Sequence, residues 1–585
     1  MTIFLATPRS EDLDARMYFA ERDIKGRRFR YVGETHWDAK KQRPRARQIV
    51  LVPVEAATRV DLSRTETVGR RRIGDVGALA WVAEQLDVVG LIDACCPSAG
   101  DGPSIGQMAV AVALQRVCEP GAKRDLAGFL DETLPRSSCI PAKRFTGQQF
   151  YRLAQQATTV GLEQAQVAIA RAVVTKFQVG ADVLAFDTTN FDTFIATTTS
   201  SELAQRGHAK SKRSDLRVVG LAVLASETGH VPLLHRTYPG NGSDQSVLSD
   251  CMGALGQLHD ALGEADGRGR KAQRTVVRDG GSWSEQLEFS LDFEGYFTLL
   301  SLPTSHKAAK GALELAAQRG NMKALRRDLS DVRAFRTRCK VGELDRTLVV
   351  VDSETLREGQ KRGIAVALKK ARVDLDKLAR LAAKGKVNRA DLDRRVRSAL
   401  AREHLATFVD VEVVPSGETM SLTYRVNARK RAQLEKHRLG RRVLCTDRHS
   451  WTTERIVRAF RGQWNVEELF RRSKSGGVSA WGPSHQWNDA SLRLHTFATV
   501  LGLTLASLVR LTLGDDTSMK RLLEELAGIQ ATMVRTSTGA KGRRPVSFIA
   551  PELSALQRRS VAVFQLDRWL PALASARRSR VKGSS

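Results

Sequence analysis

The stretch VLAFDTTNF, residues 183–191, places an acidic residue directly after a short apolar run, and the segments that follow it decide the fold. Two more apolar runs come next, LRVVGLAVLASE (216–227) and VPLLHRTYPGN (231–241), and the Thr228-Gly229 pair between them predicts a hairpin turn. Ser243 can cap a following helix, after which RTVVR (274–278) predicts another strand, ending at Asp279-Gly280-Gly281. The predicted order is therefore strand, strand, strand, helix, strand.

Three sequential strands followed by a helix and a returning strand match the beginning of a ribonuclease-H-like domain. We therefore predict an α/β chain whose ribonuclease-H-like catalytic core is a mixed sheet flanked by helices. The core is expected as two segments, separated by a basic β-rich insertion that contains a helical hairpin broken near Gly385. The predicted regions are an N-terminal β-meander region (1–75) turning at Lys25-Gly26, a helical region (76–178), the first core segment (179–289), the insertion (290–445), the second core segment (446–515) and a basic C-terminal region (516–585).

Positive charge is concentrated in the second half of the chain. The 585 residues carry a formal net charge of +29. Residues 1–300 have 37 basic and 36 acidic side chains, whereas residues 301–585 have 56 and 28. Such an excess indicates a polyanionic partner, with nucleic acid first and an acidic membrane surface second. A uniformly basic packaging protein would not be divided in this way.

Several classes of protein are disfavoured by the composition. Seven scattered cysteines without a C-x-x-C pair argue against a disulfide framework or a zinc ribbon and suit a reducing cytosol. The N-terminus has no basic segment followed by a long apolar run, so we predict no signal peptide. The stretch TFATVLGLTLASLV (496–509) falls short of the roughly 20 residues that span a bilayer, and we expect a buried core helix there.

Two aspartates follow predicted strands. Asp187 comes after VLAF and Asp279 after RTVVR, and ligands of open α/β sheets sit at the carboxyl ends of strands. Each aspartate alone is also explained as a helix cap or turn former, and Asp192 and Asp244 are explained in that way too. Two at matching strand ends favour a site for a hard, oxygen-seeking cation such as Mg²⁺.

A third acidic residue is expected on the helical segment TERIVRAFRGQWNVEELFRRSK (453–474), which offers Glu467 and Glu468. Counting in steps of three and four places Glu467 on the buried stripe of that helix, with Arg471 and Lys474 one and two turns further on. The cations would then be placed to hold phosphates. The alternative is an ordinary amphipathic helix with an ion pair such as Glu467–Arg471.

The same segment resembles the Y-x2-R-x3-E-x6-K signature of bacterial insertion-sequence DDE transposases, through Glu467 and Lys474. Phe460 and Gln463 stand where the signature has Tyr and Arg, so phosphate contacts through those two positions are not implied. Asp187 in FDTTNFDTF and Asp279 in VVRDGG resemble the family's first and second acidic positions. The resemblance runs from about residue 75 to 570, and by its register Glu467 is favoured over Glu468.

The resemblance implies that Asp187, Asp279 and Glu467 are the catalytic and metal-binding residues of a DNA transposase and hold two Mg²⁺ ions per active site, with Mn²⁺ as a substitute. It implies cleavage at the element's ends followed by attack of the freed 3′-OH on target DNA. The partners would be double-stranded DNA, as terminal inverted repeats and target, and further copies of the chain in a dimer or higher oligomer. The implied location is the bacterial cytoplasm, at the nucleoid.

Other functions remain open from the sequence. A related metal-dependent nuclease without strand transfer would have the same site residues, and a catalytically silent DNA-binding protein is a further alternative. End recognition is expected in the helical region 76–178. The residues predicted to contact DNA are Lys474, Arg471, Arg461, Lys210, Lys212 and Arg213, although a solvated loop also explains the last three.

Four tryptophans could stack on an extruded base, Trp451, Trp464, Trp481 and Trp487. We expect Trp464 in the core, while Trp481 and Trp487 lie in a predicted loop and are left open between core and surface.

Overall fold

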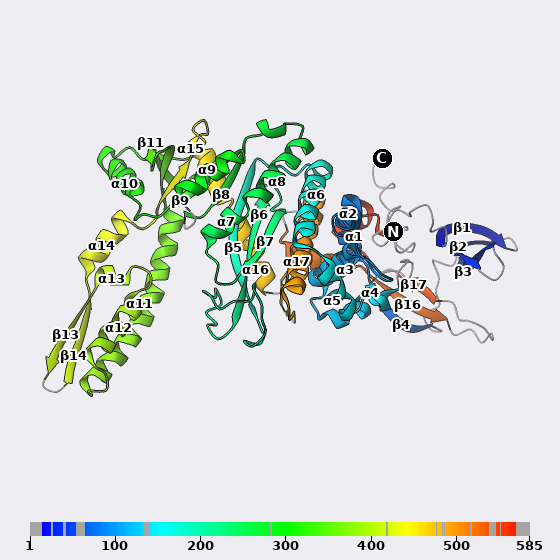
Figure 1. The fold of residues 1–585 in the computed structure, drawn as a ribbon, viewed down its shortest axis with the longest axis horizontal. Coiled ribbons are helices and arrows are strands. Elements are labelled where there is room, and N and C mark those ends of the chain that lie inside the picture. Colours follow the sequence, from blue (N-terminus) through cyan, green and yellow to red (C-terminus); the bar gives the residue numbers. More distant parts are fainter. Residues whose placement is uncertain are drawn as a thin grey trace. The chain divides into compact units, whose positions relative to one another are not determined.

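The structure, a computed structural model, describes residues 15–24, 27–38, 43–53, 65–133, 141–280, 283–416, 419–475, 477–482, 484, 486–514, 517–536, 546–549 and 552–568. The chain divides into two compact units. Unit 1 comprises residues 1–276, 290–296 and 463–585, and unit 2 comprises residues 277–289 and 297–462. Both units mix helices and strands (Figure 1), so the predicted α/β class is confirmed.

The strands predicted around Asp187 form a sheet in unit 1. Strands β5 (Val183–Thr193), β6 (Arg217–Ser226) and β7 (Pro232–Pro239) pair antiparallel, with the predicted hairpin turn at Gly229 and its φ of 70°. The next strand, β8 (Arg274–Arg278), lies beside β5, giving the order β8-β5-β6-β7. Helices α7 (Asp244–Asp250) and α8 (Met252–Ala265) connect β7 to β8, and the Ser243 hydroxyl accepts the predicted capping hydrogen bond from the Ser246 amide.

Helix α17 (Asp489–Leu513) is the central apolar helix of unit 1. It contains the stretch predicted as a buried helix, and that prediction is confirmed because nearly every residue from Ser491 to Val509 is buried. Among the described helices it alone is long and apolar enough to cross a membrane, and 83% of its most apolar window is buried inside the protein. Helix α3 (Ile105–Cys118) packs along it, and α17 also contacts β7 (Figure 1).

The other helices of unit 1 are short to medium in length. They are α1 (Gly74–Leu86), α2 (Val88–Cys95), α4 (Leu126–Thr133), α5 (Gly147–Gln156), α6 (Thr159–Phe177), α16 (Trp464–Ser475), α18 (Met519–Ala527) and α19 (Ala555–Val563), with the 3₁₀ helices η3 (Lys123–Asp125), η4 (Ala142–Arg144), η5 (Gly269–Lys271) and η8 (Leu566–Arg568). Helices α1, α5 and α6 also contact α17, so the helical region 76–178 folds around the same core helix.

Two small antiparallel sheets complete unit 1. The predicted N-terminal meander is present as β1 (Ala15–Ile24), β2 (Arg27–Asp38) and β3 (Arg43–Pro53), while its predicted turn at Lys25-Gly26 lies outside the described residues. The second sheet was not predicted from the sequence. It joins β4 (Thr65–Arg72) to β16 (Gln530–Thr536), which also pairs with β17 (Val546–Ile549).

Unit 2 contains the strands predicted in the insertion. Its main strands lie in the order β10-β11-β12-β15-β9, and β13 pairs with β14 as a hairpin. Their bounds are β9 (Tyr296–Leu302), β10 (Lys323–Ala324), β11 (Val332–Val341), β12 (Leu344–Ser353), β13 (Val409–Ser416), β14 (Thr419–Val426) and β15 (Arg441–Thr446). Helix α10 (Lys307–Arg319) covers this sheet through Ala309, Ala312 and Ala316, which belong to the same apolar core as Phe335.

The predicted helical hairpin is confirmed as α11 (Glu354–Ala383) and α12 (Arg389–Leu400). It breaks at Gly385, whose φ of 62° is a backbone conformation that glycine adopts without a steric penalty. The remaining helices are α9 (Glu285–Phe293), which belongs partly to each unit, α13 (Leu405–Phe408), α14 (Ala428–His437), α15 (Thr453–Arg461) and the 3₁₀ helix η7 (Arg327–Leu329).

Candidate active site

Asp187 lies in the middle of β5 and not at its carboxyl end as the sequence predicted. The strand continues to Thr193 because β-branched and aromatic residues extend the pairing with β6, and Asp187 itself stands opposite Val223. The carboxylate is half-buried, and its Oδ1 accepts a hydrogen bond of 2.7 Å from the Thr188 amide. Asp187 is therefore held on a strand that pairs with β6 over almost its whole length.

The polar turn before β6 folds back along β5. The Lys210 ammonium donates to the Thr188 carbonyl, and the Lys210 amide donates to Asn190 Oδ1 at 3.0 Å. The Asn190 amide group in turn donates to the His208 carbonyl at 2.8 Å, which fixes the start of the turn. Of the three basic residues predicted here to contact DNA, Lys210 thus reaches the strand that carries Asp187.

The other two basic residues of this turn point elsewhere. Arg213 forms an exposed two-pronged ion pair with Asp215, at 2.6 and 2.8 Å. Lys212 is exposed at the tip of the turn, with a φ of 65°. Asp192, the neighbouring carboxylate on β5, accepts a hydrogen bond of 2.7 Å from the Ser211 hydroxyl, which supports its interpretation as a structural residue.

Glu467 lies on α16, and the helix around it differs from the prediction. The segment 453–474 is two helices, α15 and α16, which break at Gly462-Gln463 and belong to different units. The break resets the helical phase, so the buried stripe of α16 is Val466, Leu469, Phe470 and Ser473, and Glu467 is exposed beside it. The prediction that Glu467 lies on the buried stripe is therefore wrong.

The ion pair considered as an alternative role for Glu467 does not form. Glu468, the next residue, accepts from Arg471 at 2.6 Å and from Arg472 at 3.1 Å, and these bonds lower the pKa of its carboxyl group. Glu467 keeps an exposed carboxylate on a helix that packs against β5. Lys474 follows seven residues later, about 10.5 Å further along the axis at a rise of ~1.5 Å per residue.

The Lys474 ammonium interacts electrostatically with the Asp187 carboxylate. Its ammonium is 5.7 Å from the centre of the Phe191 ring on β5. Partial burial and then repulsion by Lys210 lower the pKa of Lys474, whereas Asp192 and Asp187 oppose the shift. The structure therefore brings together one half-buried carboxylate and two lysines, a set that can hold a phosphate group beside that carboxylate.

Two stacked aromatic rings support this region. Phe191 lies flat on Trp481, with ring centres 4.8 Å apart and an interplanar angle of 13°. Trp481 is 2% exposed, its ring N–H donates to the Thr496 hydroxyl at 3.2 Å, and its amide donates to the Ser473 carbonyl at 3.1 Å. Trp481 is therefore a core residue under β5, and we call the Phe191–Trp481 pair the aromatic platform.

The other three tryptophans considered for base stacking differ in exposure. Trp464 is 57% exposed on the first turn of α16, so its predicted core position is wrong, and Trp487 is 56% exposed. In unit 2, Trp451 is flanked by the guanidinium groups of Arg448 and Arg455, whose centres are 4.6 and 5.1 Å from its ring centre. Trp464 and Trp487 are thus the more accessible rings for stacking.

Arg116, which the sequence analysis missed, fixes the loop that carries Trp481. This fully buried side chain of α3 donates to the carbonyl of Ala480 at 2.6 Å, to that of Gly121 at 2.9 Å and to that of Gly482. Burial lowers its pKa to about 10. A single arginine within the apolar run QMAVAVALQRVC was the available signal, because a buried guanidinium must find several acceptors.

A buried lysine and histidine complete this support. His495 Nε2 lies 2.8 Å from the Trp481 carbonyl, so Nε2 carries the proton and Nδ1 accepts from Lys123, 3.2 Å away. Burial and then repulsion by Arg116 lower the pKa of Lys123 to about 7. Arg116, His495 and Lys123, all in unit 1, therefore hold the Trp481 loop through this chain of contacts.

Asp279 follows β8 as predicted and belongs to unit 2. It is exposed, and its Oδ1 accepts from the Gly280 amide at 2.8 Å. A Cβ at position 280 would come within 1.7 Å of the Ser301 carbonyl oxygen, so only glycine fits after Asp279. This close approach of two backbones fixes the carboxyl end of β8.

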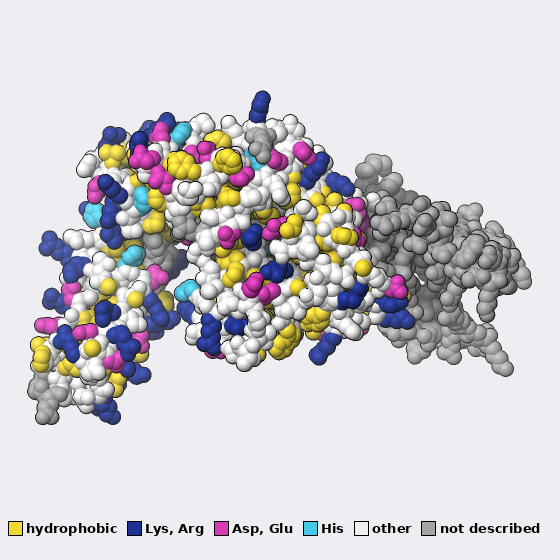
Figure 2. All heavy atoms as spheres, viewed as in Figure 1, with side chains coloured by type: hydrophobic (Ala, Val, Ile, Leu, Met, Phe, Trp, Pro, Cys, Tyr) yellow, Lys and Arg dark blue, Asp and Glu magenta, His cyan; other side chains and the backbone are white. Residues whose placement is uncertain are grey.

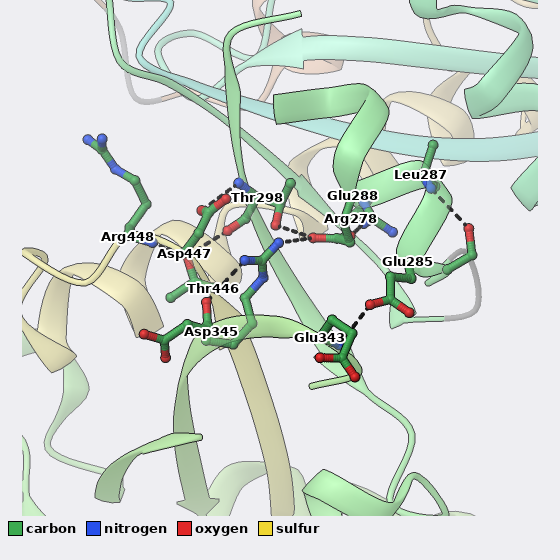
Figure 3. A network of polar contacts seen from close by, with 12 residues as sticks. Arg278, Glu285, Leu287, Glu288, Thr298, Glu343, Asp345, Thr446, Asp447 and Arg448 are labelled. Carbon is green, nitrogen blue, oxygen red and sulfur yellow. Dashed lines mark hydrogen bonds and ion pairs between the residues drawn. The ribbon is translucent and has the colours of Figure 1, made fainter. Parts of the chain in front are cut away.

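The residue before Asp279 is anchored in a buried polar network of unit 2 (Figure 3). Arg278 and Glu288 form an ion pair whose side chains are 1% and 0% exposed. The second Glu288 oxygen accepts from the Thr298 hydroxyl at 2.7 Å and from Arg346 at 3.2 Å. Burial lowers the pKa of Arg278 to about 10. Two arginines sharing one carboxylate hold β8 in place one residue before Asp279.

Arg461, also predicted to contact DNA, is paired within unit 2. Its guanidinium lies 2.9 Å from both carboxylate oxygens of Asp331, and this bond contributes to the lowered pKa of that acid. Its neighbour Arg458 pairs in the same way with Asp328. These exposed pairs fasten α15 to the segment before β11.

The predicted metal ligands supply oxygen donors of the type that Mg²⁺ prefers. Asp187 and Glu467 belong to unit 1, and Asp279 belongs to unit 2. Among the residues that the structure describes, no group of three or more His, Cys, Asp and Glu side chains is arranged as a metal centre.

Comparisons with known proteins give a likeness among solved structures only. No protein-family model matches the sequence, and no curated protein matches it. Among solved structures, the chain is similar to a piggyBac transposase in a cryo-EM structure of its synaptic complex with hairpin DNA. The identity is 10%, the match covers 77% of this chain and 78% of that chain, and the TM-score is 0.34.

Proposed function

We propose that this chain is a DNA transposase of the DDE type, encoded by an insertion sequence, with Asp187, Asp279 and Glu467 as its catalytic carboxylates. The observation that carries the proposal is the grouping of Asp187 with Lys210 and Lys474 beside β5, on which the helix of Glu467 packs. A carboxylate flanked by lysines suits a reaction at a phosphodiester. The cations attract the substrate's phosphates, and the carboxylate oxygens can bind a divalent cation.

The strand order supports a ribonuclease-H-like core. Strands β7, β6 and β5 form a meander, and the chain then crosses through α7 and α8 to place β8 next to β5. Asp187 lies on β5 and Asp279 directly follows β8, so neighbouring strands carry the first two proposed carboxylates. The third follows the long strand-rich segment of unit 2 in sequence, as an insertion between the second and third acidic positions requires.

When bound, two Mg²⁺ or Mn²⁺ ions on these carboxylates would activate the attacking oxygen and stabilise the leaving oxygen. The chain's own side chains have separate tasks. Lys474 and Lys210 hold the phosphates next to Asp187, and the aromatic platform keeps Phe191 under the Lys474 ammonium. Cleavage at the terminal inverted repeats would free a 3′-OH that attacks target DNA, in a dimer or higher oligomer at the bacterial nucleoid.

The test uses the full chain and a duplex that carries the inverted repeats flanking its gene. We expect nicking and joined products only with Mg²⁺ or Mn²⁺, and loss of both in Asp187→Asn, Asp279→Asn and Glu467→Gln. Glu468→Gln and Asp192→Asn are matched controls because each lies within five residues of a proposed ligand but has a structural partner. These two variants should cleave normally.

Each alternative has its own outcome. Complete cleavage by Asp279→Asn would refute the three-carboxylate assignment. Cleavage by the wild-type chain without any joined product would indicate the nuclease that lacks strand transfer. Binding without cleavage under every metal condition would indicate the catalytically silent DNA-binding protein.

A further inference from the structure

Helices α11 and α12 of unit 2 enclose a groove of about 260 Å³. Four cations line it, Lys370 and Lys377 on α11, Arg395 on α12 and Arg402 just after it, with Asp374 as its single acid. The other lining residues are alanine, leucine and serine. At this size the groove is smaller than pockets of roughly 300–1,000 Å³ that enclose drug-sized ligands.

Some cations of these two helices are paired with acids and others are not. Lys361 pairs with Glu358 at 2.9 Å, Arg389 pairs with Asp393 at 2.9 Å, and Arg394 pairs with Asp391. In the groove, by contrast, Lys370, Lys377 and Arg402 make no ion pair with any residue that the structure describes, while Arg395 shares Asp391. Three of the four groove cations therefore have no acidic partner among the described residues.

Unpaired cations gathered along one groove repel one another, and a polyanion laid into the groove relieves that repulsion. Residues 354–400 hold 14 Lys and Arg against 6 Asp and Glu. Figure 2 shows basic side chains along this hairpin on the exposed surface of the unit. The charge and shape of the groove are thus complementary to a chain of phosphates.

We propose that the α11–α12 groove binds the sugar-phosphate backbone of duplex DNA, as a contact separate from Asp187, Lys210 and Lys474. The proposal rests on the proposed function for the choice of DNA as the polyanion. The lining has no aromatic ring for base stacking and no amide side chain for reading adenine, and its four cations suit phosphate oxygens of the backbone. Lys370 and Lys377 are about 10.5 Å apart along α11, at ~1.5 Å per residue, which lets them reach different phosphates.

The experiment measures the salt dependence of binding to a random-sequence duplex by the full chain. All proteins carry Asp187→Asn and all buffers lack divalent metal, so the result does not depend on catalysis. The groove variant is Lys370→Gln/Lys377→Gln/Arg402→Gln. The matched control is Lys361→Gln/Arg389→Gln/Arg394→Gln, which removes the same charge from the same helices at paired positions.

We expect the groove variant to lower the slope of log K against log salt by about 2.7, at ~0.9 for each phosphate that is no longer neutralised. The control should lower it by less than one such step. Equal changes in both variants, or an unchanged slope in the groove variant, would overturn the proposal. The single variant Lys377→Gln, with an expected change of ~0.9, tests the same point if the triple variant does not fold. Failure of the proposed function would show separately, as absence of metal-dependent cleavage by a wild-type chain that binds DNA normally.

Discussion

Removing the Trp481 ring tests whether the aromatic platform supports the candidate site. Trp481 is 2% exposed, stacks on Phe191 at 4.8 Å and donates a hydrogen bond of 3.2 Å to Thr496. Aromatic stacking contributes about 0.5–1.5 kcal/mol, and a net hydrogen bond contributes a similar amount. With the cavity that a large-to-small change leaves, we expect Trp481→Ala to lower the free energy of unfolding by about 3–5 kcal/mol.

The assay is urea unfolding followed by circular dichroism, with hydrogen exchange of the α17 amides to identify the transition of unit 1. Trp481→Phe keeps a ring on Phe191 but loses the hydrogen bond, and should cost about 1–2 kcal/mol. Trp464→Ala is the control, since that ring is 57% exposed on α16, and should change stability by no more than about 0.5 kcal/mol.

DNA binding by the same variants separates support of the site from mere stability. Under conditions where Trp481→Ala is still folded, Phe191 is no longer held flat beneath the Lys474 ammonium, and the chain should neutralise up to one phosphate fewer, ~0.9 in salt slope. The reasoning fails if Trp481→Ala and Trp464→Ala lower stability equally. It also fails if Trp481→Ala leaves the salt slope unchanged while Lys474→Gln lowers it.

Two further predictions concern buried charges. In the unfolded chain Lys123 keeps its proton up to its ordinary pKa of 10.5, whereas in the folded chain it loses the proton near pH 7. Between these pH values the unfolded chain therefore binds more protons than the folded chain. Because of this difference, Lys123 makes the wild type more stable as the pH rises. The stability of wild type relative to Lys123→Met should therefore increase between pH 7 and 10 by about 1.4 kcal/mol per pH unit in urea titrations, and a pH-independent difference would contradict the assignment. Glu288→Leu leaves Arg278 and Arg346 buried without their shared carboxylate and should cost about 3–5 kcal/mol, measured as a shift of the unit 2 urea midpoint. Glu358→Gln, the control in an exposed pair with Lys361, should leave that midpoint unchanged, and equal shifts would refute a structural role for the network.

Periodicity predicted the elements whose partners lie nearby in the sequence. The hairpin of β6 and β7, the apolar helix α17 and the helical pair α11–α12 were all predicted, because each shows its buried face or its turn within a few tens of residues. Strand β4 was missed since its partner β16 lies more than 450 residues away. Its sequence, TETVGRRR, has too few apolar residues to predict a strand without that partner.

The sequence predicted which residues form the candidate site better than it predicted how they are arranged. Asp187, Glu467 and Lys474 were chosen on chemistry and on the resemblance, and the structure places β5 against the helix that carries the last two. The phase of that helix could not be predicted across the break at Gly462-Gln463, because a count in steps of 3.6 holds only within one continuous helix. The same break places Trp464 on the exposed first turn of α16, where the sequence predicted a core position.

Net charge alone did not reveal which cations are available to DNA. Arg116, Arg274 and Arg278 are fully buried, and their guanidinium groups bind carbonyl or carboxylate oxygens within the protein. They add to the +29 of the chain but cannot reach a phosphate. Lys370 and Lys377 carry the same formal charge, yet they are exposed and unpaired among the described residues. The two groups differ in burial and pairing, which depend on tertiary contacts. The salt dependence of DNA binding should therefore be set by only some of the chain's Lys and Arg side chains, and counting charges in the sequence does not identify which ones.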